Sequence, residues 1–516
     1  MTALDLSAPV AVVGTGTMGQ GIAQVALVAG HPVRLYDAAP GLAKKAAAAI
    51  TARLDRLVEK GRVDAAARDA ATGRLSAVDD LTDLAGCDLV VEAVLEQLDV
   101  KQRLFQDLEE VVAEDCLLAT NTSSLSVTAV AGALKHPGRF VGLHFFNPAP
   151  LLPLVEVVSG HATDEAAATR AYDTAKAWGK TPVRCADTPG FIVNRIARPF
   201  YAEALRVHEE RAADPATIDA VLRECGGFKM GPFELTDLIG QDVNEAVTRS
   251  VWESFFQDPK FTPSLAQRRL VESRRLGRKS GQGWFAYGAG AEKAAPHTAP
   301  HTAPHTAPHT AAPAAAPESV ALCGELFQAA ALVPLIEAAG VRVESEDATY
   351  PDFPGWIELP AGARLCLADG SSPDTAAEPT IHFDLALDYA SATRIALAPA
   401  ARVSERALGE AVGLFQALGK EVSVVGAAPG LIVARTVALL VDFAHDAVAR
   451  GVAAADDVDT AMRLGVNYPR GPLSWGTALG TYWVADFLDN MHGEYPTGRY
   501  APSQALRQAA AREEHS

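Results

Sequence analysis

A histidine and a glutamate stand close together in an otherwise apolar stretch, HFFNPAPLLPLVEVV at residues 144–158. Glu156 lies between Val155 and Val157, where burying an ionised carboxylate is costly unless it is paired. His144 is therefore the predicted partner. An imidazole held by a carboxylate can take up a proton near neutral pH, so the pair is either a structural contact or a general base.

A glycine-rich motif near the N-terminus has the spacing of a dinucleotide site. Gly14-x-Gly16-x-x-Gly19 follows the apolar run VAVVG and opens a helical stretch, and Asp37 follows 18 residues after Gly19. The glycines permit a tight turn, close approach of a pyrophosphate and helix packing, while the carboxylate accepts from a ribose 2′-OH and repels a 2′-phosphate. A simple strand-to-helix turn is the alternative. We predict NAD as the cofactor, bound by Gly14, Gly16, Met18, Gly19 and Asp37.

These residues need a sheet whose strand ends lie together. Short β-branched runs alternate with helical stretches over the first 185 residues: VAVVG, VRLYD, DLVVEAV, CLLAT, RFVGLHFF and LVEVV. This alternation predicts an α/β Rossmann-type NAD-binding domain at residues 1–185, built on a parallel sheet covered by helices. Residues 41–77 interrupt it with the pattern of two helices.

A repeat organises the rest of the chain. PGFIVNR at 189–195 returns as PGLIVAR at 429–435, and GPFELTDLIG at 231–240 returns as GPLSWGTALG at 471–480, both displaced by 240 residues. The constant displacement predicts a duplicated all-α domain, with copies at residues 186–288 and 426–516. The second copy carries Ala434 in the place of Asn194.

Four Pro-His-Thr-Ala repeats separate the two copies. Proline at every fourth position forbids a helix, so residues 289–318 are predicted to be an extended linker. Its histidines lack a fixed scaffold, and we predict no metal site. Residues 319–425 contain strand-like runs without a glycine-rich motif, which predicts a small degenerate α/β unit.

Composition argues against several classes of partner. The 516 residues carry a formal net charge of −18, which disfavours nucleic acid and anionic membranes. The six cysteines lie far apart, without metal-binding spacing, and no apolar run is long enough to span a membrane. We therefore expect a cytoplasmic protein.

Six motifs, in this order and spacing, resemble the L-3-hydroxyacyl-CoA dehydrogenases of fatty-acid β-oxidation: GTGTMGQGIAQV, VVEAVLE, NTSSLSV, GLHFFNPAPLLPLVEVV, DTPGFIVNR and GPFELTDLIG. The resemblance covers residues 9–288 and, through the repeat, residues 426–480. The two-copy layout is similar to the long bacterial form, the 3-hydroxybutyryl- or 3-hydroxyadipyl-CoA dehydrogenases of phenylacetate catabolism. The motifs are specific for the family and say little about the acyl group.

The resemblance implies a catalytic set. His144 would be the general base and Glu156 the carboxylate that holds it, while Ser123 and Asn194 would hydrogen-bond the C3 oxygen or the thioester carbonyl. Oxidising a secondary alcohol requires a base of this kind and groups that align the reacting carbon.

The resemblance also implies contacts at both ends of the ligands. Glu96, Lys101 and Asn121 match positions near the nicotinamide ribose, although a charged surface rim is the alternative. The helix pair at residues 41–77 carries a basic face that suits CoA phosphates. The remaining predicted substrate contacts are Arg53, Lys60 and Asn147.

The implied function is oxidation of (S)-3-hydroxyacyl-CoA to 3-oxoacyl-CoA with NAD. Two alternatives stay open: an NAD-dependent hydroxy-acid dehydrogenase with substrates that lack CoA, and a non-catalytic NAD-binding regulator. Short members of the family pair through their helical domain. The expected assembly is therefore a homodimer or an intramolecular pseudo-dimer, in which residues 426–516 replace a second subunit.

Overall fold

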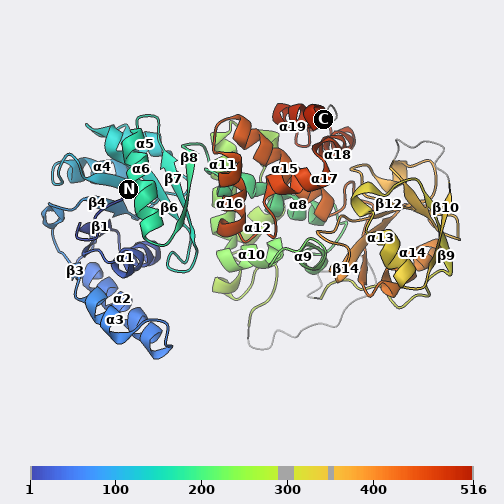
Figure 1. Cartoon of the computed structure of the whole chain (residues 1–516), viewed down its shortest axis with the longest axis horizontal. Coiled ribbons are helices and arrows are strands. Elements are labelled where there is room, and N and C mark those ends of the chain that lie inside the picture. The colour runs from blue at the N-terminus through green and yellow to red at the C-terminus, as the bar shows by residue number, and fades with distance from the viewer. Residues whose placement is uncertain (1–2, 289–306, 347–353, 514–516) are drawn as a thin grey trace. The chain divides into compact units, whose positions relative to one another are not determined.

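The computed structural model describes residues 3–288, 307–346 and 354–513. The chain forms two compact units (Figure 1): the first comprises Met1–Arg195 with Ala447–Val466, and the second comprises Ile196–Asp446 with Asn467–Ser516. A segment from the second copy of the repeat thus belongs to the first unit. Among the described residues, no helix is both long enough and apolar enough to cross a membrane.

The first unit is built on an eight-stranded sheet with strand order β3-β2-β1-β4-β5-β6-β7-β8. Neighbouring strands are parallel except β6 and β7, which are antiparallel. The strands are β1 (Val10–Val13), β2 (Val33–Tyr36), β3 (Leu75–Ala77), β4 (Leu89–Glu92), β5 (Leu117–Thr120), β6 (Phe140–Phe145), β7 (Leu154–Ser159) and β8 (Thr181–Ala186). The helices are α1 (Thr17–Ala29), α2 (Leu42–Glu59), α3 (Ala65–Thr72), α4 (Leu98–Glu109), α5 (Val127–Ala131), α6 (Glu165–Ala177), α7 (Val193–Ile196) and α16 (Ala455–Gly465).

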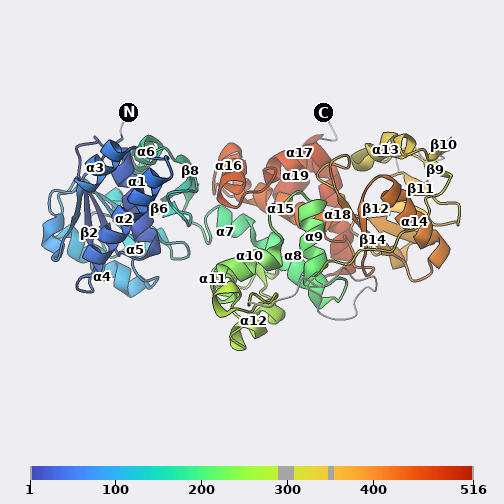
Figure 2. The same cartoon turned by 90° about the horizontal axis from the view of Figure 1, so that it is seen from below.

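Burial explains why these segments form these elements. Every residue of β1, β4 and β5 is buried, as expected for parallel strands covered on both faces. Helix α2 buries Ala46, Ile50 and Leu54 along one stripe and leaves its lysines exposed, the pattern of an amphipathic helix. Helix α16, which comes from the second copy of the repeat, packs against β7 and β8. Figure 2 shows α16 next to β8.

The second unit contains a group of helices and a seven-stranded sheet of order β10-β9-β11-β12-β13-β14-β15. Its helices are α8 (Arg198–Glu209), α9 (Pro215–Glu224), α10 (Pro232–Ile239), α11 (Gln241–Ser254), α12 (Leu265–Glu272), α13 (Leu332–Ala338), α14 (Glu405–Ala417), α15 (Val433–Ala449), α17 (Pro472–Leu479), α18 (Thr481–Glu494) and α19 (Gln504–Glu513). Its strands are β9 (Ser319–Cys323), β10 (Arg342–Glu346), β11 (Trp356–Glu358), β12 (Arg364–Leu367), β13 (Thr380–Phe383), β14 (Arg394–Pro399) and β15 (Glu421–Val424).

A buried ion cluster ties residues of both copies together inside the second unit. Glu203 of α8 binds Arg435 at 3.0 Å and Arg499 at 2.6 Å, and all three side chains are almost fully buried. The hydroxyl of Tyr500 donates to Glu203 at 2.8 Å. Burial alone would raise the pKa of Glu203, but Arg499 and Arg435 outweigh it and lower the pKa to about 2.

The last four strands of the second sheet repeat the last four of the first. β12 and β13 are parallel, β13 and β14 antiparallel, and β14 and β15 parallel, as are β5 to β8 in turn. The displacement is again 240 residues: Lys180 donates to the carbonyls of Ala149 and Leu152, and Lys420 donates to those of Tyr389 and Ala392. The predicted small α/β unit is thus a sheet that shares the terminal topology of the NAD-binding domain.

Most of the predicted linker, residues 289–306, lies outside the described residues. Its end, residues 307–318, contains no helix, but it packs more closely than its composition suggests. His309 is 2% exposed, its backbone N–H donates to Thr217 at 2.8 Å, and its Nδ1 accepts from the N–H of Val424 at 3.1 Å. These backbone and ring contacts let this segment, which is rich in alanine and proline, pack against the rest of the second unit.

Candidate active site

The predicted site residues follow strands that end at one edge of the first sheet. β1, β2, β4, β5 and β6 run parallel, so their carboxyl ends lie together, where ligands bind in open α/β sheets. The glycine motif follows β1, Asp37 follows β2, Glu96 follows β4, Ser123 follows β5, and His144 lies near the end of β6.

The glycine motif has the shape of a pyrophosphate cradle. Gly14 has a φ of +90°, and a Cβ there would lie 2.6 Å from the carbonyl oxygen of Ala93. A Cβ on Gly19 would lie 1.8 Å from the carbonyl oxygen of Gly14, whereas Gly16 faces open space. Gly16 precedes α1, whose first N–H groups receive no side-chain cap and can face an anion. These residues fit an NAD pyrophosphate.

Asp37 is oriented toward the same motif. Its carboxylate accepts from the N–H and hydroxyl of Thr15 at 2.8 and 2.7 Å and from the N–H of Ala39 at 3.0 Å. Burial would raise the pKa of Asp37, but these hydrogen bonds lower it below its ordinary value, so the group is ionised. Met18 packs, partly buried, against the core of the unit.

Glu96 organises the turn that carries Ser123. One of its oxygens accepts from the hydroxyl of Thr122 at 2.6 Å, the N–H of Ser123 at 3.0 Å and the hydroxyl of Ser124 at 2.9 Å. Burial would raise the pKa of Glu96, but Lys101 and these hydrogen bonds lower it. Glu96 therefore fixes Ser123 by its backbone.

Lys101 lies in a buried ion pair, with its ammonium 2.5 Å from Glu92 and 3.3 Å from Glu96. Glu92, which sequence reasoning missed, is fully buried and also accepts from the hydroxyl of Thr120 at 2.7 Å. It ends the apolar run DLVVE, so the reasoning applied to Glu156 could have found it. Asn121 accepts from the N–H of Phe145 at 2.9 Å, which joins the ends of β5 and β6.

His144 and Glu156 face each other across the antiparallel pair β6–β7. Nδ1 of His144 lies 2.6 Å from Oε2 of Glu156, which is fully buried. The other carboxylate oxygen accepts from the N–H groups of Ile192 and Val193 at 3.0 and 2.9 Å. Because a carboxylate only accepts, Nδ1 carries the proton in this contact and Nε2 is left to act as a base.

The surroundings of the pair are aromatic. The rings of Phe146 and Phe191 lie 4.6 and 5.8 Å from the imidazole of His144. Asn194 follows Val193 on α7, so the same turn that supplies amides to Glu156 carries the predicted asparagine.

A cavity of about 590 Å³ in the first unit brings together the three remaining predicted substrate residues. It lies between α1, α2, the turn at residues 147–151 and residues 178–180, and Arg53, Lys60 and Asn147 line it. Four buried polar atoms of its walls have no hydrogen-bond partner: Nε and Nη2 of Arg53, Nε1 of Trp178 and Oε1 of Gln24. Burial, together with the charge of Arg56, lowers the pKa of Arg53.

Comparisons with known proteins agree with this geometry. Residues 9–188 match the family profile of the 3-hydroxyacyl-CoA dehydrogenase NAD binding domain, residues 190–287 and 430–516 match its C-terminal domain, and residues 365–429 match the 3-hydroxybutyryl-CoA dehydrogenase reduced Rossmann-fold domain. The chain is 42% identical over 501 residues to the 3-hydroxyadipyl-CoA dehydrogenase of Escherichia coli K12, covering 97% of each. The chain belongs to the 3-hydroxyacyl-CoA dehydrogenase family.

Two further relatives support the assignment. The crystal structure of 3-hydroxybutyryl-CoA dehydrogenase from Escherichia coli K12 matches with a TM-score of 0.87 and 41% identity, covering 99% of this chain and 100% of that one. The mitochondrial hydroxyacyl-coenzyme A dehydrogenase of Rattus norvegicus is 41% identical over 284 residues, which are 54% of this chain and 90% of its own. The predicted family, the predicted NAD-dependent dehydrogenase activity and the predicted cofactor NAD are confirmed.

In the second sheet of this dehydrogenase, the positions equivalent to His144 and Glu156 hold other residues. Asp384 stands 240 residues after His144, and its N–H donates to the carbonyl of Ala396, which stands 240 residues after Glu156. The Asp384 carboxylate accepts from the N–H groups of Ile432 and Val433 at 3.0 and 2.8 Å, the turn that matches Ile192 and Val193. Burial raises the pKa of Asp384 to about 6. The second copy therefore has an acceptor carboxylate at the position of the histidine, alanine at the position of Glu156, and no imidazole.

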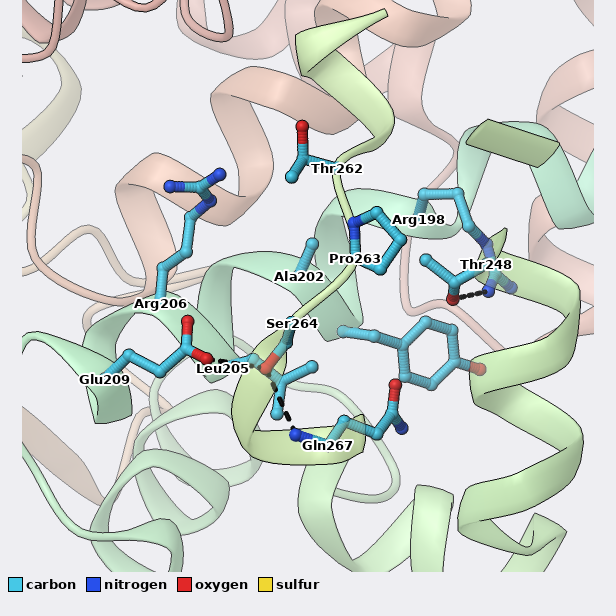
Figure 3. A pocket seen from close by; sticks show the side chains of 11 residues that line it. Arg198, Ala202, Leu205, Arg206, Glu209, Thr248, Thr262, Pro263, Ser264 and Gln267 are labelled. Carbon is cyan, nitrogen blue, oxygen red and sulfur yellow. Dashed lines mark hydrogen bonds between the residues drawn. The ribbon is translucent and has the colours of Figure 1, made fainter. Parts of the chain in front are cut away.

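A smaller cavity, about 70 Å³, lies in the second unit between α8, α11 and the start of α12 (Figure 3). Its polar groups are largely satisfied: Ser264 donates to Glu209 at 2.8 Å, and Arg198 donates to Thr248 at 3.0 Å. No predicted site residue lines it.

Proposed function

We propose that this dehydrogenase oxidises (S)-3-hydroxyacyl-CoA to 3-oxoacyl-CoA, with His144 as the general base. The observation that carries the proposal is the buried 2.6 Å contact between His144 Nδ1 and Glu156, which leaves Nε2 as the basic nitrogen. Nε2 takes the proton of the substrate hydroxyl, and Glu156 stabilises the imidazolium that forms. NAD, when bound, would accept the hydride that leaves C3.

Ser123 and Asn194 align the substrate in this proposal. They hydrogen-bond the C3 oxygen and the thioester carbonyl and so keep C3 in line with the cofactor. Glu96 supports Ser123, since its carboxylate holds the backbone of that turn. The glycine motif and Asp37 bind the pyrophosphate and the ribose.

The 590 Å³ cavity is the proposed site for the CoA moiety. Arg53 and Lys60 bring positive charge, which suits phosphates. The unpaired N–H of Trp178 and the unpaired carbonyl oxygen of Gln24 offer one donor and one acceptor, which suits an amide such as those of pantetheine. Substrates without CoA would leave these buried groups unsatisfied, which disfavours the free hydroxy-acid alternative. The complete His144–Glu156 pair disfavours a non-catalytic regulator.

The activity can be tested by NADH absorbance with 3-hydroxybutyryl-CoA, 3-hydroxyadipyl-CoA and the corresponding free 3-hydroxy acids. The two thioesters are the substrates in the names of the relatives, so we expect turnover with thioesters only. His144→Gln should abolish turnover while NAD still binds. Equal turnover of the free acids, or a fully active His144→Gln protein, would refute the proposal.

We further propose that the two copies form an intramolecular pseudo-dimer. In the first unit, the N–H of Ala186 donates to the carbonyl of Val452 at 2.8 Å, and in the second unit the N–H of Gly426 donates to that of Ala212 at 2.8 Å. Each residue of the second contact stands 240 residues from its equivalent in the first, so the exchange is reciprocal, as in an isologous interface. Light scattering should find a monomer, and a stable dimer would contradict the proposal.

We also propose that the protein works in the cytoplasm. All six cysteines are free thiols, and four of them are buried, which suits a reducing compartment. Secretion of the folded protein from its host would contradict this location.

A further inference from the structure

A glycine from the second copy lies against the residues that surround the His144–Glu156 pair. Gly465 is the last residue of α16, the helix that packs against β7 and β8. A Cβ on Gly465 would lie 2.7 Å from Cδ2 of Leu154, 3.0 Å from Cγ2 of Val193 and 3.7 Å from Cε1 of Phe146. The helix end therefore approaches closely only because residue 465 has no side chain.

Two of these three neighbours contact the pair, and the third, Leu154, shares a strand face with Glu156. Leu154 precedes Glu156 by two residues on β7, so both side chains lie on one face of the strand. The N–H of Val193 donates to Glu156, and the ring of Phe146 lies 4.6 Å from that of His144. A Cβ at position 465 would press on Leu154 and Val193 and would lie at ordinary contact distance from Phe146.

The eroded copy supplies an independent comparison. Cys225 stands 240 residues before Gly465, and its thiol donates to the carbonyl of Leu385 at 3.3 Å, beside Asp384. The sheet that lacks the imidazole thus has a side chain where the sheet with the imidazole has glycine. Glycine is present beside the sheet that has the histidine and absent beside the sheet that lacks it. The fold itself therefore does not require glycine at this position.

We propose that Gly465 is a positioning residue through which the second copy holds the His144–Glu156 pair in its working geometry. The inference rests on the proposed function, because it assigns a role at that same site. By this inference the second copy, which lacks residues equivalent to His144 and Glu156, contributes to catalysis through Gly465.

The test compares Gly465→Ala and Gly465→Val with Gly493→Ala and Gly493→Val in the full-length protein. Gly493 is also near a helix end of the second copy, but no atom lies within 4 Å of its Cβ position. Because overpacking displaces neighbours, we expect Gly465→Val to lower kcat about tenfold or more and Gly465→Ala to lower it less. KM for NAD should stay constant, and the Gly493 variants should match the wild type.

Two further measurements separate positioning from a general loss of stability. Leu154→Val removes the δ-methyl that a Cβ at 465 would strike, so in the double variant we expect it to restore kcat at least threefold over Gly465→Val alone. The downfield proton resonance of the His144 Nδ1–H should weaken or move in Gly465→Val, which can be seen without any turnover. Wild-type kcat and an unchanged resonance in both Gly465 variants would overturn the inference. A wild type inactive on thioesters would instead refute the proposed function, and the resonance would still decide the role of Gly465.

Discussion

Replacing Glu156 with glutamine tests how the imidazole is held. In the wild type, one carboxylate oxygen accepts from His144 and the other from the N–H groups of Ile192 and Val193. A glutamine has one oxygen and one NH2 group for these two roles. If its NH2 group faced the two backbone N–H groups, two buried donors would lose their acceptor, at about 1 to 3 kcal/mol each.

The glutamine oxygen should therefore face the backbone, which directs the NH2 group toward Nδ1 of His144. Nδ1 must then accept, and the ring proton moves to Nε2, the atom that should take the substrate proton. Inverting the tautomer of a catalytic histidine in this way lowers kcat by about 10⁴-fold in a comparable carboxylate–histidine pair. We expect a loss of about 10³ to 10⁴-fold for Glu156→Gln, with nearly unchanged affinity for NAD.

The assay is single-turnover NADH formation from 3-hydroxybutyryl-CoA, together with a fluorescence titration of NAD. Glu110→Gln is a matched control, since it removes the charge of a carboxylate whose ion pair with Lys135 is exposed. Retention of more than a tenth of the wild-type kcat by folded Glu156→Gln would show that the orientation of the ring does not depend on this carboxylate.

Three further changes probe the remaining parts of the molecule. Arg53→Ala removes two of the three unpaired donor atoms of the cavity, leaving Nε1 of Trp178, and should raise KM for acyl-CoA about tenfold or more, with little change in kcat, as steady-state kinetics would reveal. Gly16→Val fills the open side of the cradle and should weaken NAD binding at least about tenfold in a fluorescence titration. Glu203→Gln leaves Arg499 without its buried carboxylate and removes one of the two carboxylates that pair with Arg435, the other being Glu210; it should cost about 3 to 5 kcal/mol, seen as a lower melting temperature. The pKa of Glu203 is lowered to about 2 from 4.5, so its contribution is full above pH 4.5 and is lost as the pH falls toward 2; melting curves between these values should show this loss in the wild type and not in Glu203→Gln.

The burial of a residue could be predicted where its neighbours in the sequence determine it. Glu156 lies between valines on a strand, so its burial and its need for a partner follow from a few neighbours. The same local reasoning would have found Glu92, but its partner Lys101 lies on the following helix, among charges typical of a surface. A buried carboxylate is visible in the sequence, whereas the cation that pairs with it is not.

The basic residues of α2 show what the sequence does not reveal: which cation of a helix is exposed and which one lines a cavity. Lys44 is exposed and pairs with Asp79 at the surface, whereas Arg53 of the same helix has buried donors without partners. Both are cations on one amphipathic helix, and only the walls of the cavity distinguish them. Such walls come from α1 and from the turn at 147–151, which are far away in the sequence.

The repeat of the four sheet strands could also not be recognised from the sequence. β7 reads LVEVVS and β14 reads RIALAP, which share little identity although their partners are in the same register. A buried strand requires hydrophobic residues of suitable volume, and many sequences meet that demand. The helical turn PG-x-IV-x-R is more restrictive, so the repeat is visible there and fades in the strands.

Selective loss in the second copy follows from what each residue does for the fold. The turn at residues 432–434 presents buried N–H groups that need an acceptor whether or not any chemistry takes place. In the first copy Glu156 of β7 accepts from the equivalent turn and also holds an imidazole; in the second, Ala396 replaces that glutamate, and Asp384 provides the acceptor from the strand where the histidine would stand. One carboxylate thus meets the structural demand in a site that holds no imidazole. The two demands on Glu156 are therefore separable, and in the proposed mechanism only the contact with His144 serves catalysis.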